Sequence, residues 1–146
     1  MKQASLSTPF GDLTLTEEDG AITALGWGQA ARQDRSDLLD AALRQLKEYA
    51  TGERQSFDLP LRVMGSDFQR AVCTAIPFGH TRTYGEIARD LGVPAQAVGG
   101  ACGGNPIPVI IPCHRVMGAK GLTGFSGAGG VETKVALLRH EGAAGL

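Results

Sequence analysis

Residues 105–116 read Asn105-Pro106-Ile107-Pro108-Val109-Ile110-Ile111-Pro112-Cys113-His114-Arg115-Val116, the most informative run in this 146-residue chain. The apolar part, 107–111, predicts a buried strand between prolines that fix the backbone on both sides. Cys113 and His114 follow where this part ends. A reactive cysteine needs a lowered pKa, and an imidazole held by a carboxylate can take the thiol proton, directly or through water. The run therefore predicts a candidate thiol site, with Glu141 as the candidate carboxylate.

The Cys-His pair by itself leaves an ordinary alternative open, a buried thiol beside a satisfied histidine. Free cysteine is among the most buried residue types, so burial alone does not identify a nucleophile. A metal site is not favoured, because Cys73 and Cys102 show no ligand-pair spacing with Cys113 or with the histidines. We therefore expect no metal in this protein.

The rest of the second half is predicted to be helical. Two helices begin at capping boxes, in which Ser or Thr is followed three residues later by Gln or Glu. The helices are expected over residues 66–76, 83–91, 95–103 and 130–140. The second and third form a helix-turn-helix, and Gly99 and Gly100 lie inside the third. Each interior Gly costs about 1 kcal/mol relative to Ala, so the pair predicts close approach of another backbone, either a packed helix or a nucleic acid.

The first half has the pattern of a small sheet followed by a helix. Alternating apolar residues predict strands within 4–8, 13–15 and 22–27, with turns at 9–12 and 18–20. Leu39, Leu43 and Leu46 recur at helical spacing, and Gly52 ends that helix. The apolar run 57–63 is either one more strand or the linker to the second half.

Composition is that of a soluble globular protein, with 42% hydrophobic and 20% charged residues. No apolar run is long enough to cross a bilayer, and the first residues lack the apolar core of a secretory signal. Residues 1–64 hold 7 basic and 10 acidic side chains, and residues 65–146 hold 7 and 5. The second half, at +2, permits an anionic partner without requiring one. The expected location is the cytoplasm.

Several motifs together carry a resemblance that the single elements do not. Besides the run 105–116 they are Thr83-Tyr84-Gly85-Glu86-Ile87-Ala88, Ala97-Val98-Gly99-Gly100-Ala101, Gly124-Phe125-Ser126-Gly127 and Leu137-Leu138-Arg139-His140-Glu141-Gly142. In this order they resemble the O6-alkylguanine-DNA alkyltransferases, also called methylated-DNA–protein-cysteine methyltransferases. The resemblance implies an α/β (α+β) fold. It consists of a small ribonuclease-H-like α/β domain over 1–62 and a mainly helical, winged helix-turn-helix-like domain over 63–146, which binds DNA and holds the active site.

The resemblance also implies the function, a single-turnover DNA repair reaction. The protein is expected to flip O6-alkylguanine out of double-stranded DNA and to transfer the alkyl group irreversibly to Cys113. O6-methylguanine is the implied substrate, with O4-methylthymine beside it. No cofactor and no membrane are expected to take part, and the protein is expected to act as a monomer.

Family roles fall on matching residues of this sequence. His114 and Glu141 would activate the Cys113 thiol through water, Asn105 would hold the turn around it, and Tyr84 would donate a proton to guanine N3. The implied substrate-binding and DNA-binding residues are Gln96, Ala97, Gly99, Gly100, Arg115, Val116, Phe125 and Ser126. Arg115 is open to two roles, a structural one and a phosphate contact.

One position departs from the family pattern, and two other functions remain as alternatives. The family usually has an arginine before the Ala-Val-Gly segment, where this chain has Gln96. One alternative is an alkyltransferase-like lesion sensor, a kind of protein that lacks the reactive cysteine. The other is a Cys-His-Glu hydrolase, for which no motif indicates an oxyanion hole.

Overall fold

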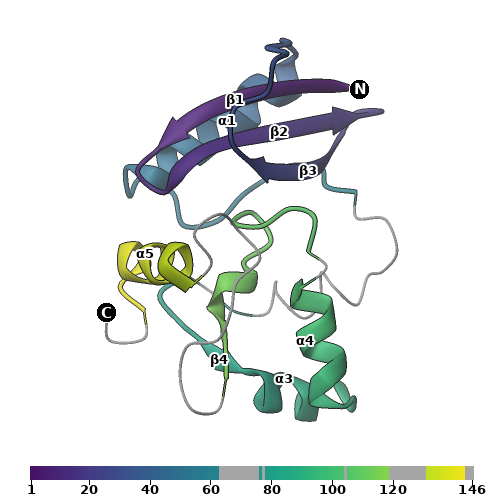
Figure 1. Cartoon of the computed structure of the whole chain (residues 1–146), viewed down its shortest axis with the longest axis vertical. Coiled ribbons are helices and arrows are strands. Elements are labelled where there is room, and N and C mark those ends of the chain that lie inside the picture. Colours follow the sequence, from purple (N-terminus) through teal and green to yellow (C-terminus); the bar gives the residue numbers. More distant parts are fainter. Residues whose placement is uncertain (63–75, 77, 104, 119–130, 144–146) are drawn as a thin grey trace. The chain divides into compact units, whose positions relative to one another are not determined.

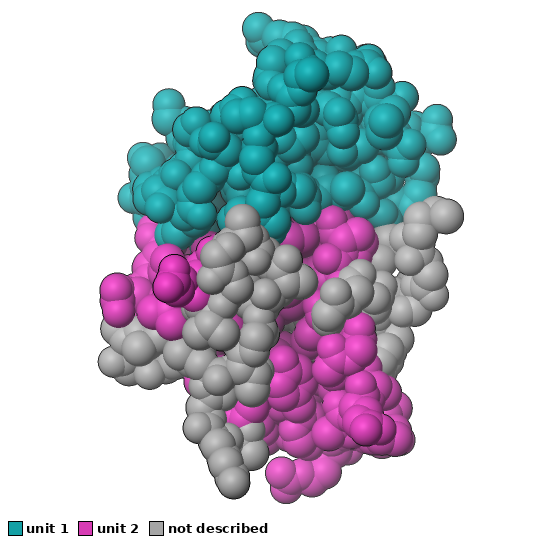
Figure 2. All heavy atoms as spheres, in the orientation of Figure 1, with its two compact units in different colours: residues 1–64 teal, residues 65–146 magenta. Residues whose placement is uncertain are grey.

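The computed structural model describes residues 1–62, 76, 78–103, 105–118 and 131–143 of the chain. The chain divides into two compact units, Met1–Met64 and Gly65–Leu146 (Figure 2). The first is a sheet with a helix and the second is mainly helical (Figure 1), so the predicted mixed α/β class is confirmed. No helix in the described ranges has the length and apolar character needed to span a membrane.

The first unit is built on a three-stranded antiparallel sheet in the order β1-β2-β3. The strands are β1 (Lys2–Thr8), β2 (Gly11–Glu18) and β3 (Ala21–Trp27), close to the predicted positions. Asp19 and Gly20 between β2 and β3 both have positive φ, 49° and 78°. This is the geometry that Asp-Gly adopts in tight hairpin turns, which explains why β3 follows β2 so closely.

Helix α1 (Asp37–Ala50) packs against this sheet. It begins at Ser36, whose side chain accepts a hydrogen bond from the Leu39 N–H at 3.0 Å. The apolar core of the unit is made of residues from both elements, namely Leu13, Leu15, Ile22, Leu39, Ala42, Leu46 and Tyr49. The helical spacing and the strand alternation in the sequence therefore point to the same interior.

The segment after α1 returns to the sheet. Leu61 forms a single parallel bridge with Ile22 of β3, and the Ile22 N–H donates to Pro60 O at 2.8 Å. Gln45 of α1 holds the same segment, since its side chain donates to Asp58 O at 3.1 Å and accepts from Asp58 N at 2.9 Å. Of the two interpretations of run 57–63, the structure favours a short strand-like pairing.

The second unit contains the predicted helix-turn-helix, formed by α3 (Tyr84–Leu91) and α4 (Ala95–Gly103). The Thr83–Glu86 capping box is confirmed, with hydrogen bonds of 3.1 and 3.0 Å. Gly92 ends α3 with φ 67°, a conformation that glycine adopts at low cost. The remaining elements are β4 (Arg82–Thr83), paired in parallel with β5 (Val116–Met117), the 3-10 helix η1 (Cys113–Arg115), and α5 (Val131–Glu141). The helix expected over 66–76 lies outside the described residues except for Ile76.

The strand predicted over 107–111 is wrong, although its predicted burial is right. The segment is a turn in which the Ile111 N–H donates to Ile107 O at 2.9 Å, and Val109 has φ 72°. Asn105 closes the turn, because its side chain accepts from Ile107 N at 3.0 Å and donates to Ile111 O at 2.8 Å. The prolines at 106, 108 and 112 have no N–H for a sheet ladder, so the polar groups of this run are paired locally instead.

Candidate active site

Cys113 is the first residue of η1 and is buried directly after the Asn105 turn. Its N–H donates to Ile111 O at 2.8 Å, which fixes the start of η1 on the turn. Burial raises the pKa of the Cys113 thiol to about 11, while a hydrogen bond with the Asn105 side chain and the positive charge of Lys134 act in the opposite direction. The thiol is therefore protonated at neutral pH, and a base is needed to produce the reactive thiolate.

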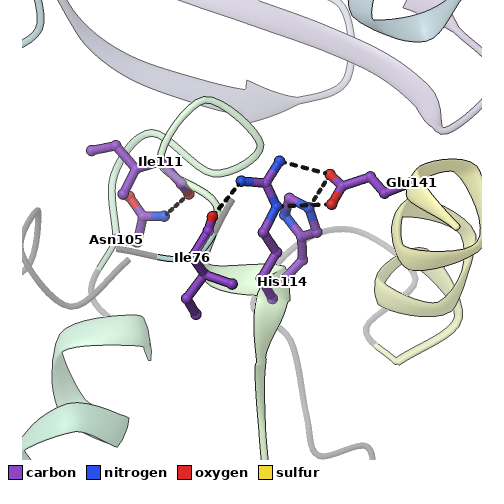
Figure 3. A network of polar contacts seen from close by, with 6 residues as sticks. Ile76, Asn105, Ile111, His114 and Glu141 are labelled. Carbon is purple, nitrogen blue, oxygen red and sulfur yellow. Dashed lines mark hydrogen bonds and ion pairs between the residues drawn. The ribbon is translucent and has the colours of Figure 1, made fainter. Parts of the chain in front are cut away.

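His114, the next residue in the chain, supplies a candidate base. Its Nε2 lies 2.6 Å from Glu141 Oε2 (Figure 3), and both side chains are fully buried. Burial lowers the pKa of His114, although Glu141 raises it, so the imidazole is neutral. A carboxylate only accepts hydrogen bonds, so Nε2 carries the proton and Nδ1 presents a lone pair. Within the described part of the chain, Nδ1 is the buried side-chain polar atom that lacks a hydrogen-bond partner.

Arg115 is buried and is engaged at each of its nitrogens. Its Nε and Nη2 donate to Glu141 Oε1 and Oε2 at 2.8 and 3.2 Å, and Nη1 donates to Ile76 O at 2.7 Å. The guanidinium also lies 5.8 Å from the centre of the Phe78 ring. Of the two roles expected for Arg115, this placement favours the structural one over the phosphate contact, since the guanidinium is buried and each of its nitrogens donates to a protein oxygen.

Lys134 of α5 is a further buried charge, and the sequence did not single it out as a site residue. Its ammonium donates to Val116 O at 2.6 Å, and burial lowers its pKa. Val116, a predicted substrate-binding residue, is also buried and accepts through the backbone carbonyl. The sequence does contain a pattern that points to Lys134. Lys134 and Glu141 lie two helical turns apart on the face that carries Leu137 and Leu138.

The other predicted DNA-binding residues lie on the helix-turn-helix pair. Tyr84 is the first residue of α3, and Gln96 is exposed in the first turn of α4. A Cβ built at Gly99 or Gly100 meets none of the described atoms within 4 Å. In the described part of the chain, no helix packs against these glycines closely enough to explain them. Ala97 is half-buried on the same helix, and Phe125 and Ser126 lie outside the described residues.

A buried thiol, followed in the chain by a neutral histidine that a carboxylate holds, is the set of groups that a cysteine-based group-transfer protein needs, and it lies in one unit with a helix-turn-helix. Two family models cover almost the whole chain. The ribonuclease-like domain of 6-O-methylguanine DNA methyltransferase matches residues 1–63, and the DNA-binding domain of the same family matches residues 67–143. The chain therefore belongs to the 6-O-methylguanine DNA methyltransferase family.

Individual relatives agree with this assignment. The methylated-DNA–protein-cysteine methyltransferase of Methanosarcina barkeri is 51% identical, over 93% of this chain and 94% of the relative. The protein of the same name from Mycolicibacterium paratuberculosis is 42% identical, over 94% and 90%. Among solved structures, Mycobacterium tuberculosis OGT in complex with DNA matches with a TM-score of 0.83 and 39% identity, over 97% of this chain and 93% of that one. The family predicted from the motifs is confirmed.

Proposed function

We propose that the protein repairs O6-alkylguanine in double-stranded DNA by transferring the alkyl group irreversibly to Cys113. Membership of the family over nearly the full length supports alkyl transfer in DNA repair. The structural observation that supports this choice of acceptor is the buried His114–Glu141 contact of 2.6 Å, next in the chain to a buried free thiol. O6-methylguanine is the proposed substrate, with O4-methylthymine as a further one.

The first step is proton removal from the thiol. With a pKa of about 11, Cys113 holds its proton until His114 accepts it at Nδ1, through a bridging water. Glu141 accepts the hydrogen bond from Nε2 and stabilises the imidazolium that forms. Asn105 and the Lys134 ammonium favour the thiolate, because each acts to lower the pKa of Cys113.

The second step is displacement at the alkyl carbon. The thiolate forms a sulfur–carbon bond while the carbon–O6 bond breaks, and the electron pair of that bond remains on the guanine. Tyr84, at the start of α3, donates a proton to guanine N3, so the base leaves as neutral guanine. The thioether formed on Cys113 has no good leaving group, and each protein molecule therefore acts once.

Residues 63–146 form the proposed DNA-binding and transfer domain, and residues 1–62 form the separate small domain of the proposal. Extruding a base costs a few kcal/mol of stacking and pairing, which protein contacts have to offset. Gln96, Ala97, Gly99 and Gly100 of α4 form the proposed contact surface, since α4 has open space around both glycines in the described part of the chain. The DNA complex of the M. tuberculosis relative supports DNA as the partner. The protein acts as a monomer in this proposal.

Intact-mass measurement tests the proposal directly. The protein is mixed with a duplex oligonucleotide that carries one O6-methylguanine, and a gain of one methyl group on Cys113 is expected. Cys113→Ser should bind the lesion without gaining mass, whereas Cys102→Ala, a control at the other described buried free thiol, should gain it. Tight binding without methyl uptake by the wild type would instead identify a lesion sensor, and turnover of an ester would identify a hydrolase.

A further inference from the structure

Glu141 is shared between His114 and Arg115, which compete for its charge. Its Oε2 accepts from His114 Nε2 at 2.6 Å and from Arg115 Nη2 at 3.2 Å, while Oε1 accepts from Arg115 Nε at 2.8 Å. The third nitrogen of the guanidinium is anchored on Ile76 O at 2.7 Å (Figure 3). Arg115 therefore fixes both carboxylate oxygens. The planar guanidinium group can do this while making a third contact, because its N–H donors point in several directions.

Among the described residues, few charged or titratable groups surround His114. Glu141 and Lys134 face it from α5, Arg115 from its own 3-10 helix, and Cys113 is its neighbour in the chain. The opposite charges of Arg115 and Glu141 cancel. The Lys134 ammonium is bonded to the Val116 carbonyl rather than to a carboxylate. Among the described residues, the net charge near the resting thiol is therefore the single positive charge of Lys134, which is the sign that a thiolate requires.

We propose that Arg115 is a positioning residue for alkyl transfer, which acts by orienting Glu141 on His114 and by cancelling its charge, so that Lys134 supplies the net charge at Cys113. This inference rests on the proposed function, because the role has meaning only if Cys113 is the acceptor. The electrostatics agree in direction, since Glu141 raises the pKa of His114 and Arg115 lowers it. Without Arg115, the carboxylate would cancel Lys134 instead and would hold a proton on His114.

A four-variant comparison tests this role. The net charge of the 115/141 pair is zero in the wild type, +1 in Glu141→Gln, −1 in Arg115→Gln and zero in the double variant. The pKa of His114 should follow this charge, lowest in Glu141→Gln, highest in Arg115→Gln, and similar in the wild type and the double variant. Each step should be about one pH unit or more, the usual effect of a close charge. The imidazole titration is read by NMR without DNA, and the acid limb of single-turnover methyl transfer should move in the same order.

If Arg115 has a purely structural role, the variants should transfer the methyl group more slowly, but the pKa of His114 should not follow the charge of the pair. That result would overturn the inference. If Arg115→Gln does not fold, the comparison of Glu141→Gln with the double variant still tests the role. Both carry Gln at position 141 and differ only in the charge at position 115. The double variant removes both charges of the pair, so it creates no new unpaired buried charge and should fold. A wild-type chain that takes up no methyl group would reject the proposed function, and with it the role in transfer. If the wild type takes up the methyl group but the pKa of His114 in the four variants does not follow the net charge of the 115/141 pair, only the proposed role of Arg115 is rejected.

Discussion

The two units of the molecule place their charged side chains differently. In Met1–Met64 the ion pairs lie at the surface, as in Arg35–Asp40 and Arg54–Glu48, and the interior is formed mainly by apolar residues of the sheet and α1. In Gly65–Leu146, by contrast, Arg115, Lys134 and Glu141 are buried. Burying an ion pair is often no more stabilising than apolar packing would be, so the second arrangement needs a reason other than stability. The proposed transfer chemistry supplies that reason.

Both units contain a buried amide side chain that holds a loop, and the two amides serve different purposes. Gln45 in the first unit and Asn105 in the second are buried amides, and each fastens a loop by donating to one backbone carbonyl and accepting from one backbone N–H. The loop that Gln45 holds completes the first core. The turn that Asn105 holds leads into Cys113. The same hydrogen bonds therefore serve stability in one unit and, in our proposal, the position of a reacting atom in the other.

The largest expected effect contrasts two Glu→Gln changes. Glu141→Gln leaves the buried Arg115 charge unpaired and should lower the free energy of unfolding by about 3 kcal/mol. Glu48→Gln removes the partner of the half-exposed Arg54 and should cost less than about 1 kcal/mol. Urea unfolding followed by circular dichroism measures both. Equal losses would mean that burial of the charge does not distinguish the two units.

A second contrast concerns the two buried amides. Asn105→Ala should slow methyl transfer about a hundredfold, because losing the turn displaces the thiol from its reacting position. Gln45→Ala removes an equivalent pair of hydrogen bonds and should leave the transfer rate of the folded protein unchanged. Single-turnover kinetics at a temperature where both variants are folded provide the measurement. A comparable slowing by Gln45→Ala would show that the effect of Asn105 is only loss of stability.

The pH dependence of stability should reveal the buried histidine. Burial lowers the pKa of His114 from its ordinary 6.5. At a pH between the lowered pKa of the folded chain and the ordinary pKa of the unfolded chain, the unfolded chain therefore binds a proton that the folded chain does not. The free energy of unfolding should therefore fall as the pH drops below about 6.5, by up to about 1.4 kcal/mol per pH unit. Urea unfolding at pH 7 and pH 5 measures the change. His114→Gln should flatten this dependence, and an unchanged slope in that variant would assign it to other groups.

The smallest effect is expected at an exposed position of the second unit. By the family resemblance, the side chain at position 96 enters the base stack where the flipped guanine was and faces the cytosine that has lost its partner. Gln96→Arg should strengthen this contact by about 1 kcal/mol, the difference between a neutral and a charge-assisted hydrogen bond. Repair of duplex DNA should then be about fivefold faster. Single-stranded DNA has no orphaned partner base, so its repair rate should change less. Equal changes on both substrates would show that residue 96 does not enter the stack.

The sequence by itself determined the elements whose hydrogen bonds are local. The Thr83–Glu86 capping box, the Asp19-Gly20 turn and the stop at Gly92 each involve residues a few positions apart, so their geometry can be read from residue types. The ordered motifs around Cys113 also identify the family from the sequence alone. The spacing of α5 placed Glu141 at the edge of an apolar face, where a carboxylate needs a partner.

Only the tertiary structure decided how the buried polar groups are paired. The run 107–111 has the apolar pattern of a strand, but the bonds of Asn105 and the missing proline donors make it a turn. Arg115 was open to a phosphate contact until its bonds to Glu141 and Ile76, 26 and 39 residues away, placed it inside. Lys134 had no assigned role until α5 brought it to Val116. Residue types tell which groups require partners, but the partner of a buried charge depends on which distant segments the fold brings within hydrogen-bond distance.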